Sequence, residues 1–204
     1  MRKFAVAALA FCLVSAPAWA QAPASDTVPV RIRGTVEKLD GQNLTVKSRD
    51  GQTMTVALAP NYVVSAYEPK KISDVKTNDF VASTGVKGTD GKLHCVELRI
   101  FPESLRGAGE GQYAWDLMPD STMTNATVTG IASAANGETL KVKYKDKESE
   151  FVADADCKVF GYVQGDPGLL KPGAAVFVVA QKKPDGSMTA PRVTAERDGV
   201  KPPM

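Results

Sequence analysis

One stretch of this chain occurs twice, and the duplication limits the folds that the sequence can adopt. Residues 34–50 read GTVEKLDGQNLTVKSRD, and residues 130–146 read GIASAANGETLKVKYKD, an offset of 96 residues. After a slip of one residue the similarity resumes at an offset of 95 and continues to residues 98 and 193. A period near one hundred residues is too long for a solenoid unit and fits a duplicated small domain.

The residue pattern within each copy indicates β-structure. Val30, Ile32 and Gly34 alternate with polar residues, which is the period of two that is typical of a half-buried strand. Three expected strands, an irregular connection over 60–78 and two further strands follow the order of a five-stranded Greek-key barrel of the OB type. We therefore expect an all-β protein made of two tandem five-stranded OB-like barrels packed on each other.

The pattern also predicts the register of the second hairpin. A loop of three residues, 49–51, pairs Val46 with Met54 and keeps the apolar side chains of both strands on one face. A loop of two residues pairs Val46 with Thr55 instead and turns that face outward. We expect a type I turn followed by a left-handed Gly51.

The first twenty residues have the features of an export signal. A basic Arg2-Lys3 pair precedes an apolar run, and Ala18-Trp19-Ala20 matches the A-x-A cleavage pattern. We expect cleavage after Ala20 and a periplasmic protein with no membrane span, because the run is too short to cross a bilayer. The chain has 25 basic and 23 acidic side chains, so loss of the leader removes the net charge. A neutral chain gives no general case for a nucleic-acid partner.

Differences between the two copies and their surroundings divide the chain into segments. The joining segment is the least repetitive part of the chain, and it is rich in glycine and aromatic residues. The expected organisation is a signal peptide (1–20), a flexible lead-in (21–27), a first OB-like barrel (28–102), an aromatic and glycine-rich linker (103–125), a second OB-like barrel (126–196) and a flexible tail (197–204).

Two cysteines, Cys95 and Cys157, remain after the expected cleavage. In an oxidising compartment an even pair indicates a disulfide first. Such a bridge contributes roughly 4 kcal/mol by the chain-entropy estimate. Two separate thiols are the alternative, because an unrelated pair need not come within bonding distance.

The linker phrases RGAGEG, WDL and STMTNATV, with the Asp-Gly turns on either side and the tail GVKPPM, resemble a group of exported alphaproteobacterial proteins of unknown function. The repeats are similar to a widespread small bacterial β-barrel domain. The resemblance covers essentially all of residues 28–204. It implies a periplasmic location and tandem barrels, and it implies no activity or catalytic residues.

Residues suited to catalysis are scarce. His94 is the only histidine, and along its strand it has the same parity as Val96, Leu98 and Ile100, the expected core face. Cys95 then points to the opposite face, so the two side chains do not form a nucleophile and base. We expect a structural histidine and a protein that is not an enzyme.

Metal binding is the alternative function. Soft ligands that suit Cu(I) occur along the chain, namely His94, Cys95, Met118, Met123 and Met188. Their spacing matches no compact metal site. We therefore expect no metal and no other cofactor, and a copper-type periplasmic protein is the second hypothesis.

The unrepeated linker is the first candidate for a functional surface. Tyr113, Trp115, Asp116 and Met118 lie within it, and a task that the barrels do not share would be expected in such a segment. The alternative is that these residues only fill a core. The sequence predicts a non-enzymatic binding or structural module whose partner is an unknown protein, envelope component or small molecule.

Overall fold

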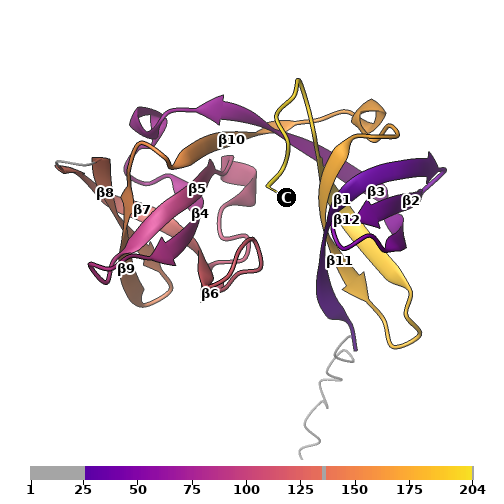
Figure 1. Ribbon diagram of the computed structural model, residues 1–204, viewed down its shortest axis with the longest axis horizontal. Helices are drawn as coiled ribbons and strands as arrows, with labels where there is room; N and C mark the ends of the chain where they lie inside the picture. The colour runs from indigo at the N-terminus through magenta and orange to yellow at the C-terminus, as the bar shows by residue number, and fades with distance from the viewer. Residues whose placement is uncertain (1–25, 135–136, 204) are drawn as a thin grey trace, which may run out of the picture.

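The computed structural model describes residues 26–134 and 137–203, and Figure 1 shows them as strands in two groups. The all-β prediction is confirmed, because the described residues contain β-strands and short 3-10 turns and no α-helix. The elements are β1 (Val28–Asp40), β2 (Asn43–Ser48), β3 (Thr53–Lys70), η1 (Ile72–Asp74), β4 (Phe80–Lys87), β5 (Leu93–Ile100), η2 (Glu103–Leu105), β6 (Gly111–Ala114), β7 (Ser121–Ala134), β8 (Gly137–Tyr144), β9 (Lys147–Ala153), β10 (Lys158–Gln164), η3 (Pro167–Leu169), β11 (Ala175–Lys182) and β12 (Met188–Ala195).

The described segments lack any helix with the length and apolar character that crossing a bilayer requires. The expected signal peptide and most of the expected lead-in lie outside the described residues.

A closed five-stranded barrel, which we call barrel A, takes its strands from both ends of the chain. β2 pairs antiparallel with β1 and β3, and β11 pairs antiparallel with β1. β12 joins β11 antiparallel and β3 in parallel, which closes the circuit β1-β2-β3-β12-β11. Its core contains Ile32, Leu44 and Val56 from the first strands and Val176 and Val193 from the last two. Inward residues alternate with outward ones, as the period of two requires.

The remaining strands form a second group, which we call lobe B. β7 pairs antiparallel with β4 and β8, β8 with β9, and β4 with β5. Two parallel residue pairs, Leu93 with Phe151 and His94 with Val152, connect β5 to β9. A separate core of Val81, Leu98 and Leu140 with their neighbours fills lobe B.

These cores do not follow the expected barrel boundaries of 28–102 and 126–196. Each core combines the first strands of one half of the chain with the last two strands of the other half. The reason is the length of β3, which continues unbroken to Lys70. A strand rises about 3.3 Å per residue, so β3 carries the chain out of barrel A and β4 and β5 are added to lobe B.

A two-stranded ribbon joins barrel A to lobe B. The second half of β3 pairs antiparallel with β10, from Ser65 with Gln164 to Lys70 with Val159. Figure 1 shows this ribbon along the top of the molecule, spanning the two groups. β10 also pairs in parallel with β5, so the ribbon is continuous with lobe B.

The hairpin register is confirmed. Val46 pairs with Met54, and Leu44 pairs with Val56. Gly51 has a φ of 82°, the left-handed conformation that the three-residue loop requires.

The chain after β12 is packed rather than extended into solvent, which differs from the expected flexible tail at 197–204. Arg197 and Val200 form an isolated bridge, and Pro202 is buried. The carbonyl of Pro203 accepts a hydrogen bond from Arg33 Nε at 3.1 Å. Figure 1 shows this end of the chain between barrel A and lobe B.

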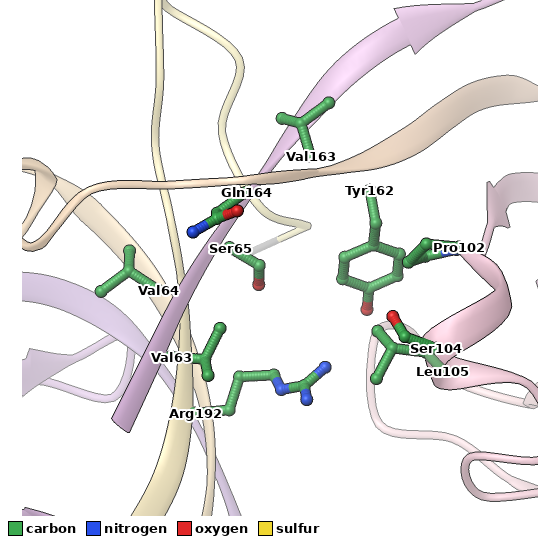
Figure 2. A pocket seen from close by; sticks show the side chains of 10 residues that line it. All are labelled: Val63, Val64, Ser65, Pro102, Ser104, Leu105, Tyr162, Val163, Gln164 and Arg192. Atoms are coloured by element: carbon green, nitrogen blue, oxygen red, sulfur yellow. The ribbon is translucent and has the colours of Figure 1, made fainter. Parts of the chain in front are cut away.

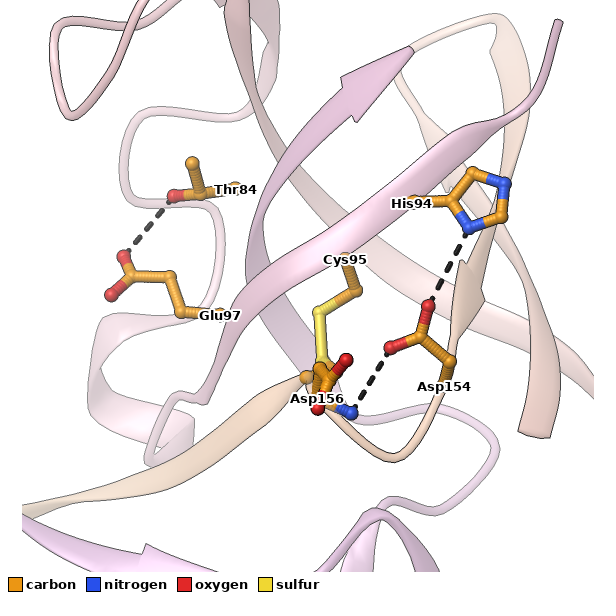
Figure 3. The surroundings of a disulfide bond; sticks show 7 residues. Thr84, His94, Cys95, Glu97, Asp154 and Asp156 are labelled. Atoms are coloured by element: carbon orange, nitrogen blue, oxygen red, sulfur yellow. Dashed lines mark hydrogen bonds and ion pairs between the residues drawn. A yellow bond between two sulfur atoms is a disulfide. The ribbon is translucent and has the colours of Figure 1, made fainter. Parts of the chain in front are cut away.

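The structure joins Cys95 of β5 to Cys157, which precedes β10, through a disulfide (Figure 3). The two residues are 62 positions apart in sequence. Cys95 is buried in the core of lobe B, and Cys157 packs against the same core. The bond therefore links the two halves of the chain inside one lobe.

We expect the double substitution of Cys95→Ala and Cys157→Ala to lower the free energy of unfolding by about 4 kcal/mol, because a closed loop of this length restricts the unfolded chain. Denaturant-induced unfolding followed by circular dichroism measures the difference. The unsubstituted protein with and without reductant is the matched control, and equal unfolding free energies there would contradict the prediction.

Candidate ligand-binding site

An ion pair between a buried arginine and a partly exposed aspartate fixes the linker to barrel A. Arg33 of β1 is 4% exposed, and its Nη1 donates to Asp116 Oδ2 at 2.6 Å. Arg49 Nη2 donates to the Asp116 carbonyl at 2.8 Å. Burial lowers the pKa of Arg33, and the Asp116 carboxylate opposes that effect. The linker and the tail are thus both held by one buried arginine.

Trp115 lies against the outer face of barrel A, beside this ion pair. The guanidinium carbons of Arg31 and Arg33 are 4.4 and 5.3 Å from the centroid of its ring. Its ring also meets Tyr113 and Phe177 at centroid distances of 6.1 and 6.3 Å in edge-to-face geometry. Cation–π and aromatic contacts of this kind hold a tryptophan in one orientation.

A chain of buried polar groups faces Trp115 from the side of lobe B. Thr84 donates to Glu97 Oε1 at 3.1 Å, and Arg99 Nη2 lies 2.9 Å from the same oxygen. Arg99 Nη1 donates to the Tyr67 hydroxyl at 3.4 Å, and that hydroxyl donates to Tyr162 at 3.0 Å. This network ties β5 of lobe B to both strands of the ribbon.

Burial sets the protonation of the network. It raises the pKa of the Tyr67 hydroxyl well above its usual range, so this group stays a hydrogen-bond donor. For Arg99, burial acts to lower the pKa, while Tyr67 and the Glu97 carboxylate outweigh it and raise the pKa. Arg99 is therefore a permanent buried cation.

A cavity of about 280 Å³, which we call the junction cavity, lies between barrel A and lobe B. Two cationic side chains, Arg31 and Arg99, are part of its wall. The wall also contains five aromatic rings, namely Phe101, Tyr113, Trp115, Tyr162 and Phe177. Val179 lies at the same wall and is 41% exposed.

Three buried polar atoms of this wall lack a hydrogen-bond partner among the described residues: Arg99 Nε, Trp115 Nε1 and Asn125 Oδ1. The Asn125 Nδ2 atom donates to the carbonyls of Ala108 and Gly109, both at 3.1 Å, which fixes the amide with Oδ1 as its free end. Buried polar groups are nearly always paired in folded proteins. These three atoms are buried within the packing behind the cavity surface.

The structure separates the four linker residues that the sequence singled out. Tyr113 and Trp115 line the junction cavity. Asp116 anchors the linker through Arg33, and Met118 is 42% exposed outside the cavity wall.

The sequence reasoning missed Arg31, Arg99 and Tyr162. Arginines at alternate positions, opposite a core face, look like an ordinary solvated strand face. Trp115 has no counterpart in the other copy of the repeat. It was the sign in the sequence that another side chain covers the arginine-bearing face of β1.

No protein-family model, curated protein or solved structure matches this chain. The function must therefore be argued from the site itself.

A second hollow of about 390 Å³ lies beside the ribbon. Figure 2 shows the Arg192 side chain reaching toward the Tyr162 hydroxyl, with Val63 and Leu105 on either side. Tyr162 lines both this hollow and the junction cavity, so the two sites share one wall residue.

His94 does not face the core, contrary to the expectation. Thr84 pairs with Glu97 and Gly85 with Cys95, so Val96 is an extra residue in β5. A bulge of one residue reverses the side-chain alternation before it. Cys95 therefore points into the core, and His94 points outward, with its side chain 37% exposed.

One of the proposed soft metal ligands is not a free thiol in the structure. Cys95 is bonded to Cys157 and cannot act as a thiolate ligand. Within the described segments, histidine, cysteine and acidic side chains form no group of three that could hold a metal ion.

We expect the substitution Asp116→Asn to lower the free energy of unfolding by about 1–3 kcal/mol, because it leaves the buried Arg33 cation without its counter-charge. Loss of the packing contacts of Trp115 should also shift its fluorescence emission to longer wavelength. Denaturant unfolding followed by fluorescence measures both quantities. Asp120→Asn, at an exposed linker position, is the matched control, and equal effects of the two changes would contradict the assignment.

His94 is placed to bind a proton more tightly than a free histidine. Its Nε2 lies 3.1 Å from Asp90 Oδ1 and its Nδ1 lies 3.5 Å from Asp154 Oδ2 (Figure 3 shows the second contact). Hydrogen bonds to Asp90 and then to Asp154 raise the pKa of His94 above its usual 6.5.

We expect NMR titration of this single histidine to give a pKa above 6.5 that falls in Asp90→Asn. Because the folded pKa is raised, the stabilisation is present below the unfolded pKa and is lost as pH rises through the folded one. A pKa unchanged by the substitution would show that the Asp90 contact is not formed in solution.

Proposed function

We propose that this protein is a non-enzymatic binding module that holds a small molecule in the junction cavity. The observation that carries the proposal is the junction cavity itself, a space of about 280 Å³ whose wall contains five aromatic rings and the side chains of Arg31 and Arg99. Cavities with a few convergent polar groups among aromatic rings are typical of ligand sites.

We further propose that barrel A and lobe B are both OB-like barrels with exchanged strands. The pairing order supports this: β7, β8 and β9 take the places of β1, β2 and β3, and β4 and β5 take the places of β11 and β12. β11 begins 95 residues after β4, and β12 begins 95 residues after β5. The two sides of a site between such barrels stay together unless β3 or β10 separates from its partner strands.

The chemistry of the wall supports binding rather than catalysis. Its side chains include arginine, asparagine, tyrosine and tryptophan, and no carboxylate, imidazole, hydroxymethyl or thiol group belongs to it among the described residues. General acid–base or nucleophilic catalysis most often uses one of those groups, and tyrosine is the only side chain of the described wall that commonly transfers a proton. The copper-type alternative has no specific observation in its favour, since Cys95 lies in the disulfide.

Export to the periplasm is part of the proposal. It rests on the A-x-A pattern that ends at Ala20 and on the paired Cys95 and Cys157, which suit an oxidising compartment.

The test is a cavity-filling substitution. Ala82 lines the cavity and is 2% exposed, so Ala82→Leu places three extra carbon atoms into the space for the ligand. We expect small molecules found by native mass spectrometry of the protein purified from periplasm to be lost from this variant. The circular dichroism spectrum should be retained.

Ala132→Leu is the matched control, because it adds the same atoms at an exposed position of β7. Equal retention of bound molecules by both variants would place the ligand elsewhere, and the proposed site would be rejected.

A further inference from the structure

The hollow of about 390 Å³ beside the ribbon contains a cation without a counter-charge. Arg192 of β12 is the one charged side chain among the described residues that line it. No ion pair, hydrogen bond or ring contact joins the Arg192 side chain to another described residue. Arg192 is partly exposed, and its side-chain nitrogens are not among the buried atoms that lack a partner, so the guanidinium can be reached from solvent.

The register of barrel A places Arg192 beside an uncovered apolar side chain. β3 and β12 pair Val63 with Arg192 and Val64 with Val193. Val64 and Val193 belong to the core of barrel A, so the alternation of side chains turns Val63 and Arg192 together to its outer face. Val63 is 44% exposed there.

Aliphatic side chains form much of the rest of the wall. The aliphatic residues are Val63, Val64, Pro102, Leu105 and Val163. Figure 2 shows Val63 and Leu105 on either side of the Arg192 guanidinium. Tyr162 contributes the only aromatic ring among the described residues of this wall. Such a wall suits an aliphatic chain, because burial of apolar surface favours association without requiring a stacked ring.

The Tyr162 hydroxyl adds a hydrogen-bond donor to the same wall. Arg99 Nη1 donates to the Tyr67 oxygen, and the Tyr67 hydroxyl donates to the Tyr162 oxygen at 3.0 Å. The hydrogen of Tyr162 itself has no acceptor among the described residues. Figure 2 shows this hydroxyl at the end of the ring that faces Arg192. A carboxylate accepts several hydrogen bonds, so it can bond to the guanidinium and to the hydroxyl at once.

The charge and the size of the hollow restrict the ligand further. A phosphate monoester carries about −1.5 to −2 charges at neutral pH, which Arg192 alone does not balance. A carboxylate carries a single charge and matches it. A volume of about 390 Å³ is near the lower end for ligand sites, which leaves room for one short chain.

We propose that the hollow beside the ribbon binds a short aliphatic carboxylate. The carboxylate lies at Arg192 and Tyr162, and the chain lies along Val63 and Leu105. This site is additional to the junction cavity, although Tyr162 lines both.

Isothermal titration calorimetry with octanoate as the probe tests the ligand class. We expect octanoate to bind with one site per chain, and octan-1-ol, which lacks the charge, to bind at least about tenfold more weakly. Octyl phosphate should bind no more tightly than octanoate. Acetate, which lacks the chain, and octylamine, which has the opposite charge, should show no binding.

A charge substitution tests the role of Arg192. Arg192→Gln should weaken octanoate binding about tenfold and leave binding of octan-1-ol unchanged. Lys47→Gln, which removes the same charge at an exposed position of β2, is the matched control and should change neither.

A second substitution tests the apolar wall. Val63→Asp places a negative charge beside the chain and the carboxylate, so it should abolish octanoate binding. Val28→Asp is the matched control, because Val28 is 64% exposed on β1 outside this hollow, and it should bind octanoate as the unsubstituted protein does. Circular dichroism checks that each variant is folded.

Ala82→Leu separates this site from the proposed function, because it fills the junction cavity and should leave octanoate binding unchanged. If Arg192→Gln binds octanoate as tightly as the unsubstituted protein, the additional site is rejected. Loss of octanoate in Ala82→Leu alone would then assign the ligand to the junction cavity and support the proposed function. If octanoate does not bind, or if octan-1-ol binds as tightly or octyl phosphate more tightly, the proposed class is overturned whatever is found at the junction cavity.

Discussion

The unbroken course of β3 is the constraint on which the rest of this structure depends. Its first half closes barrel A with β2 and β12, and its second half pairs with β10 beside lobe B. Backbone hydrogen bonds along both halves fix the distance and the angle between the two cores. The space between them is then set by a strand ladder, which is far stiffer than a flexible linker.

Two ion pairs, each with a buried arginine, lie on the two sides of the junction. Arg33 and Asp116 attach the linker to barrel A, whereas Arg99 and Glu97 lie within lobe B beneath the ribbon. An ion pair with a buried member contributes little net stability, and removal of the partner of a buried charge is costly. Their effect here is to fix positions. The first pair holds the segment that carries Trp115, the second holds the Arg99 guanidinium, and both residues line the junction cavity.

Sequence reasoning was successful where the information is local and failed where it is not. The alternation of Leu44 and Val46, together with a glycine at the loop, was enough to predict the hairpin register. The pairing of β4 and β5 with strands of the second half of the chain was beyond reach, because their patterns are the same whichever strands they pair with. The bulge at Val96 depends on cross-strand pairing and reversed the face assigned to His94. Of the site, only the linker aromatics were predicted, since the partners from β1, β5 and β10 are brought near by tertiary folding.

The exchange of strands also sets an order of events for the newly made chain. β1, β2 and β3 are synthesised first, yet barrel A lacks two of its five strands until β11 and β12 have been synthesised. Contacts between residues as distant as Val28 and Lys182 close late and slow folding, because the intervening loop must first be ordered. Lobe B is assembled entirely from the middle of the sequence. The earliest residues of the chain therefore complete their fold last.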